Sequence, residues 1–495
     1  MGRILSILST ILSNGSNYGK LILLVGTLVG IPLTVLPFYP SETKYMPSFL
    51  VPMVFSLVFG FLICVKTYRS PHKEKITEWQ SPLQRGSLII LFVWCYSFFM
   101  GALPFFISGK LDFVRALFEA VCGWTTSGFT MVEVEKMPRI FLFHRSFMQY
   151  CGGLGFVLMM VMIVQGKQST AMYGAEGHTD RPKPSIKKTA RAIFGIYNGF
   201  FLSGALLYRI FGMESFDALC HAMSALSTAG FTTQPEGIVG YGSLPVEIVT
   251  VALMLAGASN FAVLLLLTEG KIRRVFRVTE IRFMFGILSV FVPLAAFSLA
   301  AGTDMGILES FRHALFGVVA VLSTTGYYGP VSYAAWPPFA LGLLFLLMII
   351  GGSSGSTSGG IKLSRTYCLL RITRENIMAR LSPSTKRSAP SFNTVRGKAP
   401  LDNALMADTF GFVTCYMGVF IAGTLLLTLT AGCSLFEAMF EFASVLGTAG
   451  ITSGITQADA NTATLIVEMI GMILGRLEIL VVFFGVYSLY KKIRR

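Results

Sequence analysis

The stretch Thr125-Thr126-Ser127-Gly128-Phe129 has three counterparts further along the chain, and this repeat decides the fold. In each copy a threonine stands two positions before a glycine, and a bulky apolar residue follows the glycine. The other copies are Ser227-Thr228-Ala229-Gly230-Phe231, Ser323-Thr324-Thr325-Gly326-Tyr327 and Gly447-Thr448-Ala449-Gly450-Ile451. They recur at intervals of roughly 100 to 120 residues, and such a repeat predicts one structural unit per copy.

The register of the four copies extends beyond these residues. Twelve residues before each glycine stands an alanine, and about 25 residues after it stands a second glycine within an apolar run. The alanines are Ala116, Ala218, Ala314 and Ala438, and the second glycines are Gly153, Gly257, Gly352 and Gly475. Each unit is therefore predicted to hold a membrane crossing, a short helix ending in Thr-x-Gly, and a second crossing with a glycine near its middle.

The composition places the chain in a lipid bilayer. Hydrophobic residues make up 53% of it and charged residues 13%, and the mean hydropathy is +0.67. Apolar runs of about twenty residues, long enough to cross a bilayer, predict ten crossings. They are 18–40, 48–66, 84–109, 138–166, 188–211, 243–269, 280–301, 336–372, 404–430 and 460–490. Each copy of the repeat contains four residues that end in Thr-x-Gly, here called a tetrad. Four apolar segments are too short to cross, and each directly precedes a tetrad: 112–124, 214–226, 308–322 and 434–446.

The predicted fold is an all-α polytopic membrane protein. Four pseudo-symmetric helix–pore-helix–helix repeats surround one central pore, and two further transmembrane helices precede them. The predicted divisions are an N-terminal two-helix extension (1–70), pore repeats at 84–168, 186–275, 279–374 and 403–495, and a cytoplasmic linker (375–402). The third repeat is expected to contain a broken inner helix.

The placement of basic residues predicts the orientation. The chain has 40 Lys and Arg against 25 Asp and Glu, a formal net charge of +15. Most of the basic residues gather in alternate loops, at 66–85, 167–191, 271–282 and 362–398, and in the last five residues. The positive-inside rule puts these loops and both termini in the cytoplasm. Because no basic patch carries a soluble domain around it, a nucleic-acid partner is not expected.

Repeated Thr/Gly turns within a membrane predict a site for a dehydrated cation. Irregular backbone at membrane depth is tolerated only where it lines protein or a water-filled cavity. The C-terminal end of each short helix carries a partial negative charge, and glycine can take the positive φ that turns carbonyl groups toward an axis. Rings of backbone carbonyls replace the hydration shell of potassium in channels. The residues predicted to bind transported potassium are Thr125, Thr126, Ser127, Gly128, Ser227, Thr228, Ala229, Gly230, Ser323, Thr324, Thr325, Gly326, Gly447, Thr448, Ala449 and Gly450.

The four copies are not identical. Gly447 replaces the hydroxyl residue found at that position in the other three copies, and Tyr328 stands where Thr130, Thr232 and Thr452 stand elsewhere. The predicted ring is therefore pseudo-four-fold with unequal sites. The bulky residue after each glycine is expected to pack behind the tetrad. Thr-x-Gly at ordinary helix ends is the alternative, but four copies in register weigh against it.

A glycine- and serine-rich stretch interrupts the second crossing of the third unit. The glycines of this stretch are Gly351, Gly352, Gly355, Gly359 and Gly360. Each glycine costs a helix about 1 kcal/mol, so two half-helices joined by a loop are expected. The four tetrads together are the predicted selectivity filter of the pore. A loop just below this filter is expected to occlude the pore and to move aside when the pore opens. A kinked, close-packed helix is the structural alternative.

Arg476 is a charged residue deep within the last apolar run. It is about fifteen residues from either end of that run, which is about 20 Å from each surface at 1.5 Å per residue. Its side chain must therefore face a polar cavity or a partner. We expect it to repel cations below the filter and to bond the carbonyls of the 351–360 stretch. Alternatively it is a structural hydrogen-bonding residue, paired with Glu468 or Glu478.

Other chemistry finds no support in the sequence. The eight cysteines form no C-x-x-C pair, and the five histidines are scattered, so neither a metal centre nor a prosthetic group is expected. No Asp, His or Cys cluster suggests an enzyme. The segment Gly355 to Lys362 is similar to a phosphate-binding loop, but its lysine comes one residue late and no cytosolic strand precedes it.

With these motifs the chain resembles the Trk/Ktr/HKT superfamily of potassium transporters, specifically the membrane subunit of bacterial Trk-type uptake systems. The resemblance covers almost the whole chain, including the four tetrads, Gly351 to Lys362, and Gly475-Arg476-Leu477-Glu478-Ile479. It implies a homodimer in the inner membrane, one pore per subunit, an intramembrane gating loop, and a cytosolic nucleotide-binding regulatory subunit with Rossmann-like domains. In plant relatives a serine at the first filter glycine accompanies sodium preference, so Gly128 implies potassium.

Two questions stay open at this level. A cation-coupled secondary transporter with alternating access is the alternative function, although all four units face the same way and favour a single pore. The sequence does not decide between symport and channel-like conduction. The polar segment from Arg374 to Pro400 either transmits force from a partner to the gate or is a solvated linker.

Overall fold

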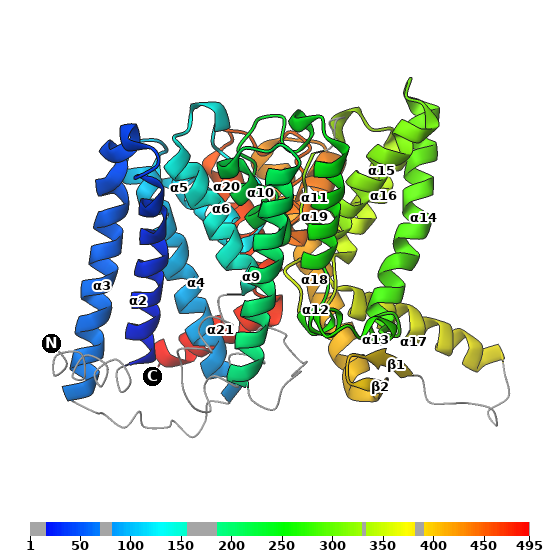
Figure 1. The fold of residues 1–495 in the computed structure, drawn as a ribbon. Coiled ribbons are helices and arrows are strands. Elements are labelled where there is room, and N and C mark those ends of the chain that lie inside the picture. The colour runs from blue at the N-terminus through cyan, green and yellow to red at the C-terminus, as the bar shows by residue number, and fades with distance from the viewer. Residues whose placement is uncertain (1–15, 70–81, 156–185, 329–332, 382–390, 495) are drawn as a thin grey trace.

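The computed structural model describes residues 16–69, 82–155, 186–328, 333–381 and 391–494. Most of the described chain is helical. The strands that it describes are β1 (Ser391–Thr394) and β2 (Gly397–Pro400), which pair antiparallel as a hairpin. Helices α2 (Asn17–Gly30) and α3 (Met46–Arg69) pack against each other at one edge of the molecule (Figure 1).

Four units of one plan follow this helical pair. Each begins with a long helix: α4 (Pro82–Ile107), α9 (Ile186–Ile210), α14 (Thr279–Gly302) and α18 (Asn403–Ala431). Each then has a short helix ending at its tetrad: α5 (Phe113–Thr125), α10 (Ser215–Leu226), α15 (Ile307–Leu322) and α19 (Leu435–Gly447). The four short apolar segments predicted from the sequence are thereby confirmed.

The second crossings are less regular than predicted. They are formed by α6 (Arg139–Leu154), α11 (Leu244–Gly257) with α12 (Phe261–Thr268), α16 (Pro338–Ile350) with α17 (Leu363–Leu381), and α20 (Thr462–Arg476) with α21 (Ile479–Ile493). The pair α11 and α12 is bent by 116°, and the pair α20 and α21 by 106°. The crossings predicted over 243–269 and 460–490 are therefore bent pairs of helices, because the chain turns sharply at 258–260 and 477–478.

Among the described residues, six helices are long and apolar enough to cross a membrane, and the two bent pairs raise this to eight. The other two predicted crossings are not single helices among the described residues. The one at 336–372 contains the 351–360 loop, and residues 156–166 of the one at 138–166 lie outside the described chain. Short elements complete the chain: α13 (Ile272–Val275) and the 3-10 helices Ile31–Val35, Pro40–Tyr45, Val134–Lys136, Val239–Tyr241 and Tyr333–Ala335.

The short helices begin with side-chain caps in two of the units. Asp112 accepts a hydrogen bond from Arg115 N at 3.0 Å to start α5. Ser434 and Glu437 form a reciprocal capping box that starts α19. The Ser434 hydroxyl and backbone N–H both bond the Glu437 carboxylate and lower its pKa. These caps fix where α5 and α19 begin.

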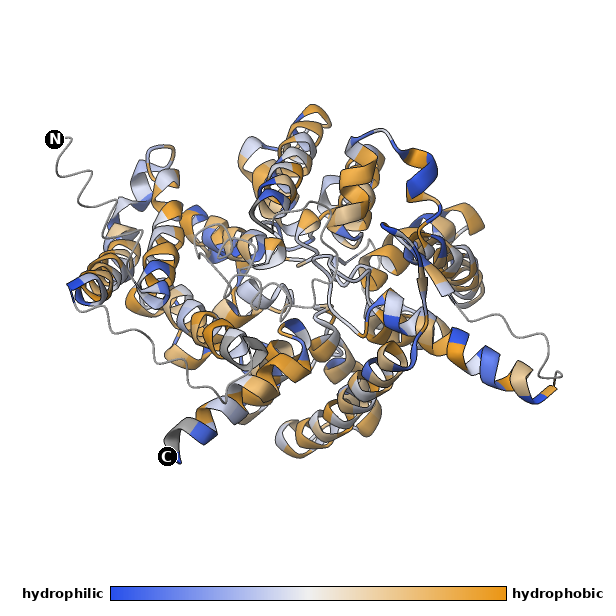
Figure 2. Ribbon diagram, turned by 90° about the horizontal axis from the view of Figure 1, so that it is seen from below, coloured by the Kyte–Doolittle hydropathy of each residue, from blue (hydrophilic) through white to orange (hydrophobic). Residues whose placement is uncertain are grey.

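The helices surround a centre crossed by non-helical chain, as Figure 2 shows from below. The short helices α5, α10, α15 and α19 occupy the upper half of Figure 1, and one continuous apolar core runs through all four units. Large apolar side chains also cover the outside. On α9, for example, Leu202, Leu206 and Ile210 are 62%, 61% and 63% exposed. An apolar exterior around an apolar core is typical of a multi-pass membrane protein.

The polar segment after α17 is partly structured. Asn393 N, in β1, donates a hydrogen bond to Thr279 Oγ1 at the start of α14, at 2.8 Å. A small buried cluster of Cys368, Ile372 and Leu401 joins α17 to the chain beside the hairpin. The described part of this segment therefore rests on the third unit, and residues 382–390 lie outside the described chain.

Candidate ion-conduction site

The four tetrads form a closed ring. A methyl group placed on Gly128 would come within 2.6 Å of Ala229 O, in the next unit. The same substitution on Gly230 would meet Thr325 O, and on Gly326 would meet Ala449 O. Gly450 closes the ring, because a methyl there would meet Ser127 O of the first unit. Each tetrad therefore lies against the carbonyl group of the next, in the order one, two, three, four and back to one.

The backbone conformation repeats in all four tetrads. The glycines have φ of +84° (Gly128), +84° (Gly230), +68° (Gly326) and +75° (Gly450), as glycine was expected to allow. The threonines two residues earlier also have positive φ: +57° (Thr126), +52° (Thr228), +59° (Thr324) and +52° (Thr448). A β-branched residue in this region costs about 1–3 kcal/mol. Sequence reasoning missed this strain, which recurs at every copy and concentrates at the centre of the ring.

The four threonine hydroxyls have different partners. Thr228 Oγ1 lies 2.9 Å from Thr357 Oγ1, and Thr324 Oγ1 accepts a hydrogen bond from Gly359 N at 2.9 Å. Thr126 Oγ1 and Thr448 Oγ1 are buried and have no hydrogen-bond partner among the described residues. The 351–360 loop therefore contacts two of the threonine hydroxyls, whereas the other two are unpaired within the described chain.

The bulky residues after the glycines pack behind the ring as expected. Phe129, Phe231, Tyr327 and Ile451 are all buried. The tetrads themselves alternate: Thr125 and Ser127 bond each other in the first unit at 2.8 Å, and Ser323 and Thr325 do so in the third at 2.7 Å. Ala229 replaces one hydroxyl of this pair in the second unit, and Gly447 and Ala449 replace both in the fourth, so the sites are unequal.

A side chain from the first unit holds the tetrad of the second. Gln149 Nε2 donates to Ala229 O at 2.9 Å, and Gln149 Oε1 accepts from Phe231 N at 3.3 Å. The Ala229 carbonyl, which was predicted to face an ion, thus has a protein partner. Nothing in the sequence pattern singled out Gln149.

The stretch 351–360 is a loop between α16 and α17, so a continuous kinked helix is wrong. Positive φ occurs at Gly351 (+69°), Gly355 (+66°) and Gly360 (+77°). A methyl on Gly359 would collide with Gly447 O and Thr448 Oγ1, so the loop touches the fourth tetrad directly. These glycines allow the loop backbone to turn and to approach the ring closely.

The loop also rests on the bend of the second unit. Ser353 N donates to Ala258 O at 2.9 Å, and Thr357 N donates to Gly257 O at 3.1 Å. Phe261 N donates to Gly355 O at 3.2 Å. The bend between α11 and α12 exposes backbone groups that the loop then satisfies, which explains why both irregular segments occur side by side.

Arg476 ends α20 instead of lying in the middle of a straight helix, so its predicted position in a continuous crossing was wrong. Its guanidinium donates to Thr357 O at 2.5 Å and to Gly152 O at 2.6 Å. It therefore joins the 351–360 loop of the third unit to α6 of the first. Glu468, one of its suggested partners, instead contacts Thr456.

Two further charged residues lie beside Arg476. Lys362, at the end of the loop, donates from Nζ to Ser358 O. Glu478 pairs with Arg365 at 2.7 Å, linking the fourth unit to α17. Lys362, Arg476 and Glu478 line a cavity of only about 50 Å³ next to the loop. The sequence pattern counted Lys362 among the cytoplasmic charges and left the role of Glu478 open.

Glycines of the second crossings allow close approach to the ends of the short helices. Methyl groups on Gly257 and Gly475 would collide with Leu226 O and Leu446 O, respectively. In the first unit the corresponding glycine is Gly152, against Trp124 O, whereas the sequence register indicated Gly153. The glycine predicted for the first unit is therefore wrong by one residue, because the number of residues between the tetrad and this glycine differs from unit to unit.

Four helical units with re-entrant turns meeting at one centre define a pore-type cation-transport protein of the membrane. The family described as "TrkH: Cation transport protein" matches residues 53–487, and the chain belongs to that family.

Relatives match over most of the chain. The Trk system potassium uptake protein TrkH of Halomonas elongata is 29% identical over 410 residues, which cover 80% of this chain and 84% of that protein. The Trk system potassium uptake protein TrkG of Escherichia coli K12 is 28% identical, covering 90% of this chain and 92% of that one. The crystal structure of the potassium transporter TrkH from Vibrio parahaemolyticus superposes with a TM-score of 0.81 at 25% identity, covering 94% of this chain and 96% of that one.

Proposed function

We propose that this protein takes up potassium across the cytoplasmic membrane and that the four tetrads are its selectivity filter. The observation that carries this proposal is the closed ring, in which each filter glycine lies against a carbonyl of the next unit. Relatives that match over most of the chain are named potassium uptake proteins. A ring of carbonyl oxygens replaces the water around potassium, and the ends of four short helices add partial negative charge.

The 351–360 loop and Arg476 are the proposed gate. The loop bonds the filter threonines Thr228 and Thr324 from below, and Arg476 bonds the loop. In this arrangement the loop occupies the path below the filter, and a positive charge beside it opposes entry of a cation. Lys362 adds a second positive charge at the same cavity. Opening requires the loop to leave Arg476 and both threonines.

The proposed setting of the protein follows its relatives. We place it in the bacterial inner membrane with both termini in the cytoplasm, because the basic loops gather on that side. The domain divisions given above stay as the proposed units. The relatives belong by name to a Trk system, which supports further subunits. A homodimer with a cytosolic nucleotide-binding regulatory subunit carrying Rossmann-like domains is our proposal for that assembly. Transport, and not catalysis or nucleic-acid binding, is the proposed activity, with potassium as cargo and no prosthetic group.

Rubidium uptake by cells that lack their own potassium transporters tests this function. Cells making this chain should accumulate rubidium. Excess potassium should inhibit rubidium uptake, whereas sodium at the same concentration should not. Equal competition by sodium would show a non-selective cation path. Uptake that depends strictly on a sodium or proton gradient and saturates like a carrier would favour alternating access instead.

A further inference from the structure

The first and fourth units each have a glutamate at the same position before the filter glycine, but one glutamate has a cationic neighbour and the other a second carboxyl group. Glu119 and Glu441 each stand nine residues before the filter glycine. Counting back seven residues from the packing glycines Gly152 and Gly475 gives Arg145 in the first unit and Glu468 in the fourth. Arg145 Nε bonds Glu119 Oε1 at 2.5 Å, and both side chains are buried. The fourth unit therefore places a second carboxyl group where the first unit has a guanidinium.

Five donor groups surround the Glu441 carboxylate. They are the hydroxyls of Thr452 (2.8 Å), Ser453 (2.9 Å) and Thr456, and the backbone N–H groups of Ser453 (2.5 Å) and Thr456 (3.2 Å). Both oxygens of Glu441 are satisfied as acceptors. An ionised carboxylate accepts only, so this environment fits a charged Glu441.

Glu468 has the opposite environment. It is fully buried, and its Oε1 lies 2.9 Å from Thr456 Oγ1. Its Oε2 has no hydrogen-bond partner among the described residues. Within that part of the chain, no lysine, arginine or histidine forms an ion pair with Glu441 or Glu468. A charged carboxylate left in this state would be very costly, so the neutral acid fits Glu468.

The hydrogen atoms can be counted at Thr456. Its hydroxyl contacts an oxygen of both carboxyl groups but carries one hydrogen atom. We assign that hydrogen to Glu441, because the other four donors around its carboxylate mark it as the acceptor. The contact with Glu468 then requires a hydrogen from the Glu468 side, donated by its O–H to Thr456 Oγ1.

We propose that Glu468 and Glu441 bind one exchangeable proton, held on Glu468 and connected to the Glu441 carboxylate through Thr456. When the proton leaves, it passes from Glu468 to Thr456, whose own proton moves to Glu441 and from there to water. Two neighbouring buried carboxylates then repel each other. The segment after the fourth filter tetrad, which Glu441 holds through Thr452 and Ser453, loses its fixed position.

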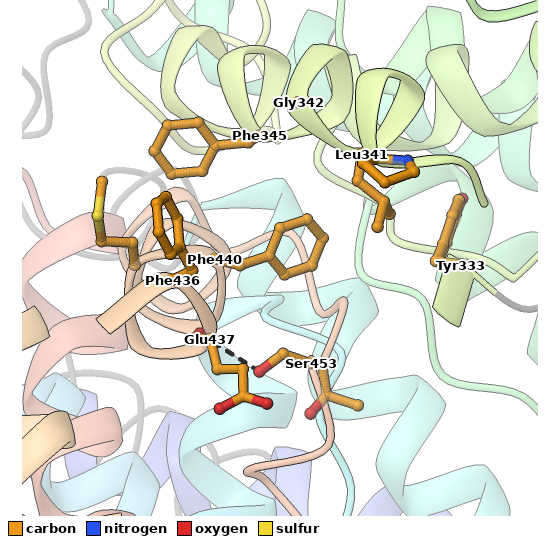
Figure 3. A pocket seen from close by; sticks show the side chains of 11 residues that line it. Tyr333, Leu341, Gly342, Phe345, Phe436, Glu437, Phe440 and Ser453 are labelled. Atoms are coloured by element: carbon orange, nitrogen blue, oxygen red, sulfur yellow. Dashed lines mark hydrogen bonds between the residues drawn. The ribbon is translucent and has the colours of Figure 1, made fainter. Parts of the chain in front are cut away.

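Two cavities border the segment that Glu441 holds. Thr452 and Ser453 line a cavity of about 660 Å³ between α16 and α19. Figure 3 shows Glu437 and Ser453 together at its polar end, beneath the aromatic side chains of Phe345 and Phe440. Ser453 also borders a second, more polar cavity of about 590 Å³. Glu441 itself is buried and lines neither cavity, so in this proposal its proton reaches cavity water through the Ser453 hydroxyl.

Other charged and titratable groups lie on the elements packed around Glu441 and Glu468, and none of them forms an ion pair with either carboxyl group among the described residues. They are Arg115, Glu119 and Cys122 on α5, Glu437 on α19, Asp408, Cys415 and Tyr416 on α18, Cys433 and Asp459 in the adjoining loops, Tyr328 after the third tetrad, and Arg476, Glu478, Tyr487, Tyr490 and Lys491 toward or beyond the far end of α20. The charge of Glu119 is offset by Arg145. Arg115, the cation on α5, bonds Ala458 O and Asp112 instead.

Infrared spectroscopy of the purified full-length chain in lipid tests the proposal without reference to transport. At neutral pH we expect a carbonyl-stretch band from a protonated carboxylic acid that shifts in D₂O. Glu468→Gln, which keeps the size and neutrality of the acid, should lose this band. Glu437→Gln, which removes an exposed carboxylate on the same cavity, should keep it. The proposal is overturned if the parent protein lacks the band or if Glu468→Gln keeps it. A metal cation held between two ionised carboxylates would leave the parent protein without the band.

Rubidium uptake into proteoliposomes provides the functional measurement, which alone rests on the proposed transport. As outer pH rises, the band should disappear in the parent protein and uptake should fall over the same range. Glu468→Gln uptake should be independent of outer pH, and Glu437→Gln should follow the parent. A Glu468→Gln profile identical to the parent profile, or parent uptake unchanged while the band disappears, contradicts the link to the filter. If neither protein transports rubidium, the infrared result still decides the proton site.

Discussion

The guanidinium of Arg476 bonds the carbonyl oxygen of Thr357 at 2.5 Å, and so ties the end of α20 to the loop that interrupts the third unit. The same side chain reaches Gly152 O at 2.6 Å on the other side. One residue of the fourth unit thus joins the third and first units next to the ring of tetrads. A forked guanidinium can make both bonds at once, whereas an ammonium group lacks that fixed geometry.

Replacing Arg476 is predicted to open the pore. Two unit charges about 5 Å apart repel by about 3 kcal/mol at an effective dielectric constant of 20, and counter-charge such as Glu478 reduces this. Arg476→Ala should raise rubidium uptake about ten-fold, which corresponds to about 1.4 kcal/mol. Arg476→Lys keeps the charge but loses the two simultaneous hydrogen bonds to Thr357 O and Gly152 O. Its uptake should therefore also rise if these hydrogen bonds, and not the charge, make the barrier. Parent-like uptake in Lys with faster uptake in Ala would assign the barrier to charge; no change in either folded variant would make Arg476 purely structural.

Shortening the 351–360 loop is predicted to raise basal flux and preserve ion preference. Deletion of residues 354–356 removes the loop's contact with Phe261 N, while the four tetrads keep their own backbone bonds. Rubidium uptake should increase, and the ratio of rubidium to sodium competition should stay as in the parent. Size-exclusion chromatography in detergent provides the folding control. A folded deletion variant with equal or lower uptake would exclude the occluding role of the loop.

The ion pair between Glu119 and Arg145 is predicted to be a stability requirement behind the first tetrad. Both side chains are buried, so Arg145→Met should leave an unpaired charge and destabilise the protein by about 3–5 kcal/mol. The double variant Glu119→Gln with Arg145→Met should recover most of that loss. Thermal unfolding of the detergent-solubilised protein measures both effects. Equal melting temperatures for the single and double variants would argue that packing of Arg145 on Phe231, and not charge, accounts for the loss.

Much of the site was predictable because it depends on local chemistry repeated four times. The tetrads, the four short helices and the break at Gly351–Gly360 all follow from residue types and spacing. The bends at 258–260 and 477–478 did not, since apolar composition continues through both and the turns are held by contacts with other units. The positive φ of Thr126 and its counterparts was equally hidden, because threonine ordinarily avoids that region. Arg476 was recognisable as a buried charge, but its partners Thr357 and Gly152 belong to distant segments.

The central claim, that the ring of tetrads selects potassium, is tested most directly at Gly230. A side chain there would meet Thr325 O of the neighbouring unit, and its φ of +84° disfavours any residue but glycine. The matched control is Gly286→Ser, since Gly286 lies on α14 with open space beside it.

Rubidium uptake with increasing sodium, in the parent, Gly230→Ser and Gly286→Ser, is the measurement. We predict that sodium competes weakly in the parent and in Gly286→Ser but strongly in Gly230→Ser, because the distorted ring no longer fits potassium better than sodium. Unchanged sodium competition in a folded, transporting Gly230→Ser variant would contradict the assignment of the filter.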